Sequence, residues 1–516
     1  MIKKDVSMDL PGRSRRLTLR PRYQMTWSEQ MPIFEADHLR KAFIGGRWVE
    51  PVNGGVEHDI INPATGEVSG VLLFSDEADV NLAAEAARDA FAAFSNTPLV
   101  ERLKLLERVI GAYTERLQDM ADAITLEMGA PMDAISRPLQ AALGLWHLHT
   151  TLEVAKQYPF ERTQGTSRIV KEPVGVCGLI TPWNWPMNQV MCKVAPALVA
   201  GCTIVLKPSQ NAPYSAIVLA EILEKAGVPP GVFNLVQGAG QRLGRAIASS
   251  PLFDMVSLTG STSAGVEVAQ AAATTIKRVT LELGGKSANI ILDSENFQQG
   301  VTHGVLQMMA NSGQTCTAPS RMLVPAHRLE EAEQIAVAAC AQVVVGDPHD
   351  PGTTMGPMAN QRQHRKVQEM IQTGIDEGAV LLSGGLGNPA GLERGYYVKP
   401  TVFSRVNNRM TIATEEIFGP VLVIIPYRDE SDAVAIANDS PYGLSGYVYG
   451  DSIEQAERVA RKLRTGMVHL NGASVDIAAP FGGYKQSGNG REWGYAGIEE
   501  FLETKSMFGA VPGAVS

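Results

Sequence analysis

The chain has 516 residues, too many for one hydrophobic core, so we expect two or three domains. Apolar residues make up 45% and charged residues 19%, as in soluble globular proteins, and no apolar run is long enough to span a bilayer. The net charge of −9 excludes a general attraction to nucleic acid or to an anionic membrane. The five cysteines show neither a disulfide framework nor metal-ligand spacing, so we predict no metal site and a reducing, cytoplasmic location.

The first 36 residues are predicted to form a poorly ordered N-terminal arm. Five arginines crowd positions 13–22 with few acidic residues, and there is no apolar stretch typical of a secretory signal. An organelle transit peptide, a solvated arm and a misplaced start codon all fit this pattern, and the sequence leaves the three open.

A hairpin-like pattern begins at Phe43, with Asn-Pro and Thr-Gly turns between its apolar runs. A long amphipathic helix follows, because apolar residues recur at steps of three and four from Leu103 to Ile124. Gly129 and Pro131 are predicted to end this helix.

Between residues 174 and 292 short β-rich runs alternate with amphipathic helical segments. The runs are Val174–Thr181, Thr203–Leu206, Val232–Val236, Asp254–Leu258 and Ala288–Leu292. This alternation predicts a parallel sheet with helices on both faces, which would bind ligands at the carboxyl ends of its strands. A second α/β section is expected up to about residue 480, and a final strand is expected near residue 503.

Cys316 lies in a small polar loop after a helical segment that Asn311 and Gly313 should end. A thiolate attacks carbonyl carbon well, and a loop position lets it reach a substrate. The alternative is a buried, inert cysteine, which is the commoner state of a free thiol. This segment alone does not decide between the two.

Three other segments have a functional and a structural interpretation. Asn184, between two Trp and two Pro residues, could donate to an oxyanion or only stabilise its own turn. Glu282, in an apolar strand, could be a general base, or it could be satisfied by backbone N–H groups. Gly260 and Ser261 follow a strand and could bind a phosphate or only cap a helix.

Two glycine patterns are weaker signals. Gly238, Gly240 and Gly244 form GxGxxxG, which is one residue longer than the dinucleotide fingerprint. Residues 284–287 read Gly-Gly-Lys-Ser, like the end of a P-loop, but Thr280 stands where the first glycine is required. We therefore reject a P-loop.

Seven motifs then occur in a fixed order. They are Pro-Trp-Asn-Trp-Pro, Lys-Pro-Ser, Thr-Gly-Ser-Thr, Leu-Glu-Leu-Gly-Gly-Lys-Ser, Gly-Gln-Thr-Cys-Thr, Glu-Glu-Ile-Phe-Gly-Pro and Pro-Phe-Gly-Gly-Tyr-Lys-Gln-Ser-Gly. From about Phe43 to about Ser506 the chain resembles the NAD(P)-dependent aldehyde dehydrogenase superfamily of the hydrolytic, non-CoA-acylating type.

The resemblance implies an α/β fold in three parts. A Rossmann-like parallel-sheet cofactor domain would combine residues 37–150 and 174–284. An α/β catalytic domain would follow over residues 285–484. A small β oligomerisation element would combine residues 151–173 and 485–510. Its open strand edges are usually covered, so we expect a homodimer or homotetramer.

The resemblance also implies catalytic roles for five residues. Cys316 matches the nucleophile, and Asn184 with the Cys316 backbone N–H matches the oxyanion donors. Glu282 matches the base that activates the hydrolytic water, while Lys193 and Glu492 match positions that relay protons from it. The thiol would form a thiohemiacetal and then a thioester. Because the thiolate is the attacking form and a free cysteine is mostly protonated at neutral pH, the site should lower the pKa of Cys316.

The cofactor implied by the resemblance is NAD(P). Lys207 matches the adenosine-ribose contact, Ser261 the pyrophosphate contact, Glu416 the nicotinamide-ribose carboxylate and Phe418 the residue beside the nicotinamide. The full set expected to bind the cofactor is Thr181, Pro182, Trp183, Lys207, Ser209, Gln210, Gly240, Gly244, Thr259, Gly260, Ser261, Gly265, Leu283, Gly284, Glu416 and Phe418. Many NAD-preferring relatives carry Glu at the position of Gln210, so we expect use of both NAD and NADP here.

The aldehyde is predicted to be medium-sized and hydrophobic or aromatic. Residues thought to line its path are Trp185, Gln189, Cys192, Val475, Asp476 and Ile477. A semialdehyde acid is less favoured because no arginine is placed to hold a carboxylate. A CoA-acylating dehydrogenase, a cysteine esterase and a non-catalytic protein of the same fold are competing interpretations, and Glu282 argues against the first of them.

Overall fold

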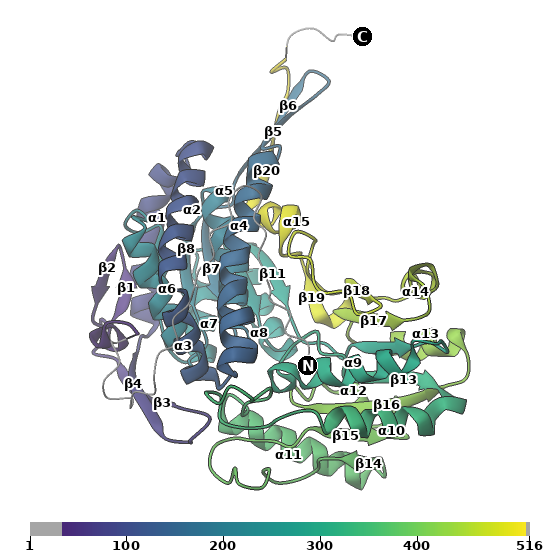
Figure 1. The fold of residues 1–516 in the computed structure, drawn as a ribbon. Coiled ribbons are helices and arrows are strands. Elements are labelled where there is room, and N and C mark those ends of the chain that lie inside the picture. The colour runs from purple at the N-terminus through teal and green to yellow at the C-terminus, as the bar shows by residue number, and fades with distance from the viewer. Residues whose placement is uncertain (1–32, 512–516) are drawn as a thin grey trace. The chain divides into compact units, whose positions relative to one another are not determined.

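The computed structural model describes residues 33–511, so most of the predicted N-terminal arm lies outside the described residues. Two large sheets, each with helices packed on it, make up most of this part of the chain (Figure 1). A three-stranded sheet and a hairpin of β3 (Val56–Ile61) and β4 (Val68–Phe74) complete it. Within residues 33–511, no helix has the length and apolar character needed to cross a membrane. The expected α/β fold with parallel sheets is confirmed.

The first large sheet has eight strands. In spatial order they are β19 (Gly488–Asn489), β11 (Arg278–Glu282), β10 (Met255–Thr259), β7 (Val176–Ile180), β8 (Thr203–Lys207), β9 (Phe233–Leu235), β1 (Ala42–Ile44) and β2 (Arg47–Val49). The five strands from β11 to β9 are parallel, while β19, β1 and β2 join by antiparallel pairing. The parallel core was expected from the buried apolar runs; the antiparallel edges were not.

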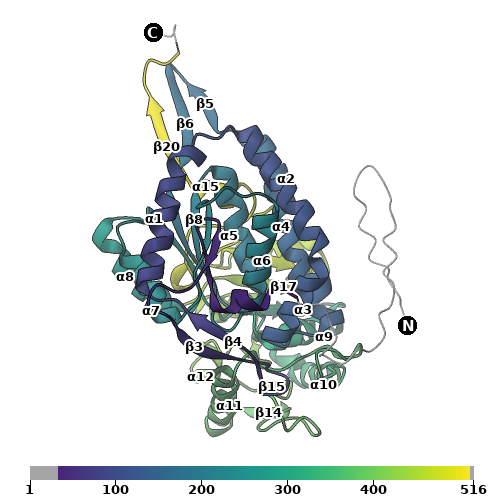
Figure 2. The ribbon, with the colours of Figure 1, turned by 90° about the vertical axis from the view of Figure 1, so that its left-hand side faces the viewer.

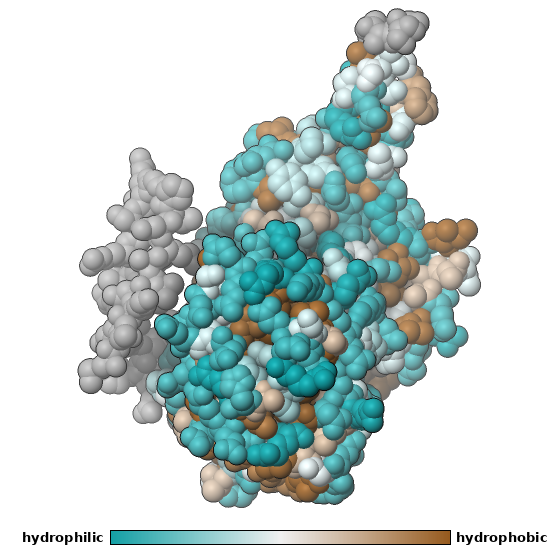
Figure 3. Space-filling model, turned by 90° about the vertical axis from the view of Figure 1, so that its right-hand side faces the viewer, coloured by the Kyte–Doolittle hydropathy of each residue, from teal (hydrophilic) through white to brown (hydrophobic). Residues whose placement is uncertain are grey.

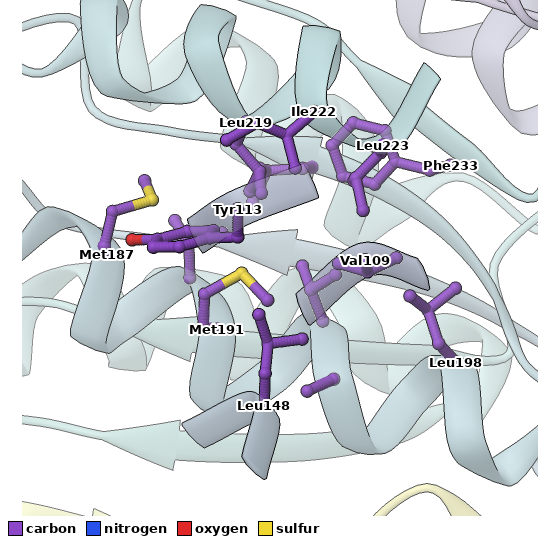
Figure 4. Close-up of a cluster of buried hydrophobic side chains, with 14 of the residues drawn as sticks. Val109, Tyr113, Leu148, Met187, Met191, Leu198, Leu219, Ile222, Leu223 and Phe233 are labelled. Carbon is purple, nitrogen blue, oxygen red and sulfur yellow. The ribbon is translucent and has the colours of Figure 1, made fainter. Parts of the chain in front are cut away.

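Helices cover both faces of this sheet. One face carries α1 (Glu77–Phe94), α7 (Gly240–Ser249) and α8 (Thr262–Ala272). The other carries α2 (Leu99–Glu115), α3 (Leu117–Met128), α4 (Ala142–Gln157), α5 (Pro186–Ala200) and α6 (Pro213–Lys225). Side chains of β7 alternate between the two cores, with Val176 in the first and Cys177 in the second. Figure 4 shows the second core, where Tyr113 of α2 lies among side chains of α4, α5 and α6.

The prediction of one long helix from Leu103 to Ile124 is wrong. The helical segment is interrupted at Arg116 and forms two helices, α2 and α3. The Arg116 guanidinium donates to Glu221 on α6 at 3.1 Å, a tertiary contact that the helical periodicity does not encode. The predicted end is correct: Gly129 adopts a left-handed conformation with φ of 74°.

The second large sheet has seven strands. In spatial order they are β14 (Val380–Ser383), β15 (Thr401–Ser404), β16 (Val421–Tyr427), β13 (Arg321–Pro325), β12 (Ala288–Ile291), β17 (Ser445–Tyr449) and β18 (Met467–Leu470). The helices of this region are α9 (Phe297–Met309), α10 (Leu329–Cys340), α11 (Gln361–Asp376), α12 (Thr411–Thr414), α13 (Glu430–Asn438) and α14 (Ile453–Ala460). The chain passes from β11 in the first sheet to β12 in the second across residues 283–287.

The three-stranded sheet consists of β5 (Glu161–Gln164), β6 (Ser167–Pro173) and β20 (Leu502–Met507), paired antiparallel. It extends away from the two large sheets (Figure 2). In the view of Figure 3, the surface of this projecting three-stranded sheet is mostly hydrophilic, with scattered hydrophobic groups. The expected final strand is confirmed as β20.

Two segments assigned to the oligomerisation element have other contacts. Residues 151–157 are the last turns of α4, which packs in the second core. Residues 488–489 form β19 of the eight-stranded sheet, and α15 (Gly494–Glu499) follows them before the chain reaches β20. The alternation of side chains along a strand does not show which sheet the strand joins. The boundaries of the oligomerisation element at residues 151 and 485 stay predictions.

Candidate active site

Cys316 lies in the loop between the short turn η4 (Ala310–Gly313) and β13. Asn311 has φ of 53° and Gly313 has φ of 69°, so α9 ends where the sequence predicts. A Cβ built on Gly313 would stand 2.2 Å from the carbonyl oxygen of Gly419, so only glycine fits this turn. The loop that carries the thiol therefore has a fixed path into the space between the sheets.

Asn184 is held against this loop. Its Nδ2 donates to the carbonyl of Gln314 at 3.0 Å, and its own carbonyl accepts from Asn311 Nδ2 at 3.0 Å. The next residue, Trp185, donates from Nε1 to Thr315 Oγ1 at 2.9 Å. An amide nitrogen carries two hydrogens, so one on Asn184 remains for another acceptor beside the cysteine loop.

Glu282 ends β11 as a buried carboxyl with 4% of its surface exposed. Neither of its oxygens has a hydrogen-bond partner within residues 33–511, so the interpretation that backbone N–H groups satisfy it is wrong. Burial, together with the charge of Glu492, raises its pKa well above the usual range. Such a carboxyl accepts a proton more readily than an exposed one.

The expectation that the site lowers the pKa of Cys316 is wrong. Burial raises the pKa of this thiol far above its usual range, and the charges of Glu416 and Glu282 raise it further. The sequence shows the carboxylates but not that they converge on the sulfur. The thiol therefore keeps its proton at neutral pH and needs an acceptor for that proton when it reacts.

Lys193 and Glu492 form a buried ion pair beside Glu282. The Lys193 ammonium contacts Glu492 Oε1 closely and donates to Ser257 Oγ at 3.0 Å. Burial, the largest single effect, would lower the pKa of Lys193, but the charge and hydrogen bond of Glu492, with the charges of Cys192 and Glu282, together outweigh it and raise that pKa. A third contact was not expected from the sequence: Cys192 Sγ lies 3.2 Å from Glu492 Oε2.

Unpaired polar groups gather at the carboxyl ends of the central parallel strands. The hydroxyls of Thr181, after β7, and Thr259, in β10, are buried without a partner among the described residues. Lys207 ends β8 with 2% exposure; burial is the one cause of its lowered pKa of about 8, and no carboxylate within residues 33–511 pairs with it. Gly240 N, at the start of α7, donates to Gln210 Oε1 at 3.1 Å. These groups fit a polar ligand at the sheet edge.

Glu416 and Phe418 lie across from this edge. Gly285 N donates to Glu416 Oε1 at 3.0 Å, and a Cβ on Gly284 would stand 2.2 Å from Oε2. The Phe418 ring meets Trp183 edge to face, with ring centroids 5.5 Å apart. The segment of residues 283–285 thus brings the two halves of the predicted cofactor site together.

The remaining predicted cofactor residues have mainly structural contacts. Ser261 Oγ accepts from Ala264 N at 3.2 Å and so caps α8, which fits the structural interpretation while leaving the hydroxyl exposed. A Cβ on Gly265 would stand 2.7 Å from Leu283, and one on Gly244 would approach Ile180 at 3.8 Å. Three others lie in turns at these strand ends: Pro182, Ser209 and Gly260.

An apolar cluster borders the cysteine loop. It contains the buried residues Cys192, Leu444, Phe481 and Trp493, with Cys316, Met467 and Ile477 packed against them. Of the predicted lining residues, Cys192 and Ile477 belong to it, while Gln189 is buried on α5 and Val475 is exposed. Phe481 and Trp493, with ring centroids 4.5 Å apart, were not predicted, although Trp493 directly follows the predicted Glu492.

Comparison with known proteins agrees with this site. The model of the Aldehyde dehydrogenase family matches residues 48–507. A 3-succinoylsemialdehyde-pyridine dehydrogenase from a Pseudomonas species is 57% identical over 470 residues, which cover 91% of this chain and 98% of that protein. The resemblance read from the seven motifs is confirmed.

Solved structures give the same result. Aldehyde dehydrogenase C of Pseudomonas syringae, a cysteine-to-alanine mutant in complex with NAD+ and octanal, superposes with a TM-score of 0.92 at 48% identity, covering 93% of this chain and 99% of that one. An aldehyde dehydrogenase of Mycobacterium tuberculosis in complex with NAD+ has a TM-score of 0.89 at 39% identity, covering 92% and 99%.

Proposed function

This chain belongs to the aldehyde dehydrogenase family and oxidises aldehydes to carboxylic acids, and we propose that Cys316 is the residue that the substrate acylates. The observation that carries the proposal is that a half-buried thiol, the free amide hydrogen of Asn184 and the unpartnered carboxyl of Glu282 lie around one loop. The charges of Glu282 and Glu416 also act on the Cys316 sulfur and raise the pKa of its thiol.

The cofactor that we propose is NAD or NADP, because the P. syringae and M. tuberculosis relatives both hold NAD+. Lys207 and Ser261 would hold the adenosine half, and Glu416 and Phe418 the nicotinamide half. The buried Lys207 ammonium, which has no carboxylate partner within residues 33–511, and the two unpaired threonine hydroxyls at the same sheet edge support this fit. When bound, the nicotinamide accepts the hydride from the aldehyde carbon.

In the proposed first half-reaction, Cys316 Sγ adds to the aldehyde carbon and loses its proton. Asn184 Nδ2, already oriented by the Gln314 carbonyl, donates its second hydrogen to the resulting oxyanion. Loss of hydride then leaves a thioester on the sulfur. Because the pKa of the thiol is raised, its proton must pass to an acceptor as the sulfur attacks.

In the proposed second half-reaction, Glu282 takes a proton from water as the water attacks the thioester. The C–S bond breaks, the Cys316 thiolate takes the proton that remains on the new carboxyl group, and the product leaves as a carboxylate. The proton on Glu282 passes towards the Lys193–Glu492 pair, whose buried charges act on Glu282. The carboxyl of Glu282 supports hydrolysis over transfer of the acyl group to CoA.

The substrate that we propose is a medium-sized hydrophobic or aromatic aldehyde. The apolar cluster with Phe481 and Trp493 supports it, as do the pyridine compound in the name of the Pseudomonas relative and the octanal in the P. syringae structure. Arg491, an arginine in this region, donates from Nη1 to the backbone carbonyls of Gly483, at 3.1 Å, and Gly490, so this nitrogen is already engaged. A semialdehyde that also carries a carboxylate is therefore less favoured.

The assembly that we propose is a homodimer or homotetramer formed through the three-stranded sheet. Strand β5 is exposed along its whole length, and β20 is exposed from Glu503 onward. Exposed edges of this kind are normally covered. A cytoplasmic location stays a prediction, which the five free cysteines support.

The test is Cys316→Ser, with Cys340→Ser, a cysteine in a different core, as the control. Reduced nicotinamide is followed by absorbance with a panel of aliphatic, aromatic and carboxylated aldehydes, and the acyl-enzyme is sought by mass spectrometry. We expect loss of turnover and of the acyl adduct in Cys316→Ser alone. Native turnover in that variant would overturn the proposal, and preference for carboxylated aldehydes would overturn the substrate class.

A further inference from the structure

The thiol of Cys192 has no role in the proposed reaction, yet it contacts a carboxylate that does. Cys192 directly precedes Lys193 on α5, and its Sγ lies 3.2 Å from Glu492 Oε2. The Lys193 ammonium contacts the other oxygen of the same carboxylate. Two consecutive residues of one helix therefore hold both oxygens of Glu492.

The thiol is the donor in this contact. Its Sγ also lies 3.4 Å from the carbonyl oxygen of Gln189, but it has a single proton to donate. Giving that proton to Gln189 would turn the sulfur lone pairs towards a negatively charged carboxylate. Burial, followed by the charge of Glu492, raises the pKa of Cys192 well above its usual range, so the proton stays on the sulfur.

The surroundings of Glu492 make the position of its carboxylate important. The titratable groups that act on it from neighbouring elements are Lys193 and Cys192 of α5, Glu282 of β11, His147 of α4, Glu500 after α15 and Cys316 of the catalytic loop. Two of these are carboxyls that repel it. The two donors on α5 oppose this repulsion. Without them, the repulsion would favour a rotamer of Glu492 whose carboxylate points away from Glu282.

We propose that Cys192 is a positioning residue for proton transfer, whose S–H group fixes Glu492 Oε2 so that the carboxylate stays in place to receive protons from Glu282. This inference rests on the proposed function. It assigns Cys192 to the hydrolysis of the acyl-enzyme and not to the step in which Cys316 attacks the aldehyde.

The test separates the two half-reactions as a function of pH. Cys192→Ala and Cys192→Val remove the donor, and Cys192→Ser keeps one. Cys340→Ala is the control, because it removes a buried thiol of another core, whose Sγ lies 3.4 Å from the Pro400 carbonyl. The burst of reduced nicotinamide reports attack and hydride loss. The decay of the acyl-enzyme, followed by rapid quenching and mass spectrometry, reports hydrolysis.

We expect the burst to be unchanged in all variants. Acyl-enzyme decay should slow about three- to tenfold in Cys192→Ala and Cys192→Val, the effect of one modest hydrogen bond. The pH at which decay is half-maximal should move upward, because loss of a donor favours the protonated carboxyl. Cys192→Ser should restore both values.

Three outcomes would overturn the inference. They are a decay profile of Cys192→Ala and Cys192→Val equal to that of Cys340→Ala, an equal loss of burst and decay, and a failure of Cys192→Ser to restore the profile. Absence of a burst in the unmodified protein would instead reject the proposed function itself.

Discussion

Gly284 and Glu416 are in such close contact that a single methyl group would disturb them. A Cβ on Gly284 would stand 2.2 Å from Glu416 Oε2, while the next backbone N–H holds Oε1 at 3.0 Å. The carboxylate proposed to bind the nicotinamide ribose is thus positioned by a segment that leads from one sheet to the other. Its position depends on the absence of a side chain.

The first prediction follows from this contact. Gly284→Ala should displace the Glu416 carboxylate and lower kcat/KM for the cofactor by about tenfold or more, since displacements near 1 Å at a reacting site have effects of that size. Gly111→Ala is the matched control, because nothing lies within 4 Å of a Cβ built there. Initial rates at varied cofactor concentration measure the effect. Equal kinetics of the two variants would contradict the positioning role of Gly284.

The second prediction concerns Glu282. Glu282→Gln keeps the size of the side chain but removes the base, so the first hydride transfer should appear as a burst while steady turnover falls by about 10²- to 10⁴-fold. Stopped-flow absorbance of reduced nicotinamide measures both phases. Glu115→Gln, which alters an exposed pair with Lys225, is the control. Loss of the burst as well would mean that the carboxyl also takes the proton of Cys316.

The third prediction concerns cofactor choice at Gln210. Its Oε1 accepts from Gly240 N, so a carboxylate at this position could keep the same hydrogen bond while adding a negative charge. Gln210→Glu should lower the ratio of kcat/KM for NADP to that for NAD by roughly tenfold or more, because that charge would repel a 2′-phosphate. The unmodified protein should use both cofactors. A ratio that does not change would show that Gln210 does not face the phosphate position.

The fourth prediction concerns the pH dependence of stability. Lys286 is buried, its Nζ has no hydrogen-bond partner within residues 33–511, and burial, aided by Arg321, lowers its pKa from 10.5 to about 7. Between these two values the unfolded chain binds more protons than the folded one, so this group makes stability rise with pH across that window. Below pH 7 both states are protonated, and the full cost of burying the ammonium remains.

Lys286→Met should therefore stabilise the protein most below about pH 7, by about 3 kcal/mol, with a gain that shrinks as the pH approaches 10. Calorimetric Tm values across this range measure it. Lys104→Met, which alters an exposed pair with Glu101, should show no such trend. A gain from Lys286→Met that is the same at every pH would mean that folding does not lower the pKa of this lysine.

Much of the fold could be predicted because its signals are local. Strands β7, β8 and β10 are buried on both faces, so their apolar runs are continuous and easily read. The end of α9 was predicted because left-handed positions favour Asn and Gly, which occur there at Asn311 and Gly313. The same analysis joined α2 and α3, because helical periodicity continues across the break at Arg116.

The sequence by itself determined the alternation of strands and helices, the family, and which residue types stand at the predicted catalytic positions. Only the tertiary structure decided that Cys192 contacts Glu492, 300 residues further along the chain, and that the charges of Glu282 and Glu416 act on the Cys316 sulfur. Side-chain periodicity and turn preference arise between near neighbours in the chain. Burial, pKa values and contacts between distant carboxylates and thiols depend on how the sheets and helices pack, which no single segment encodes.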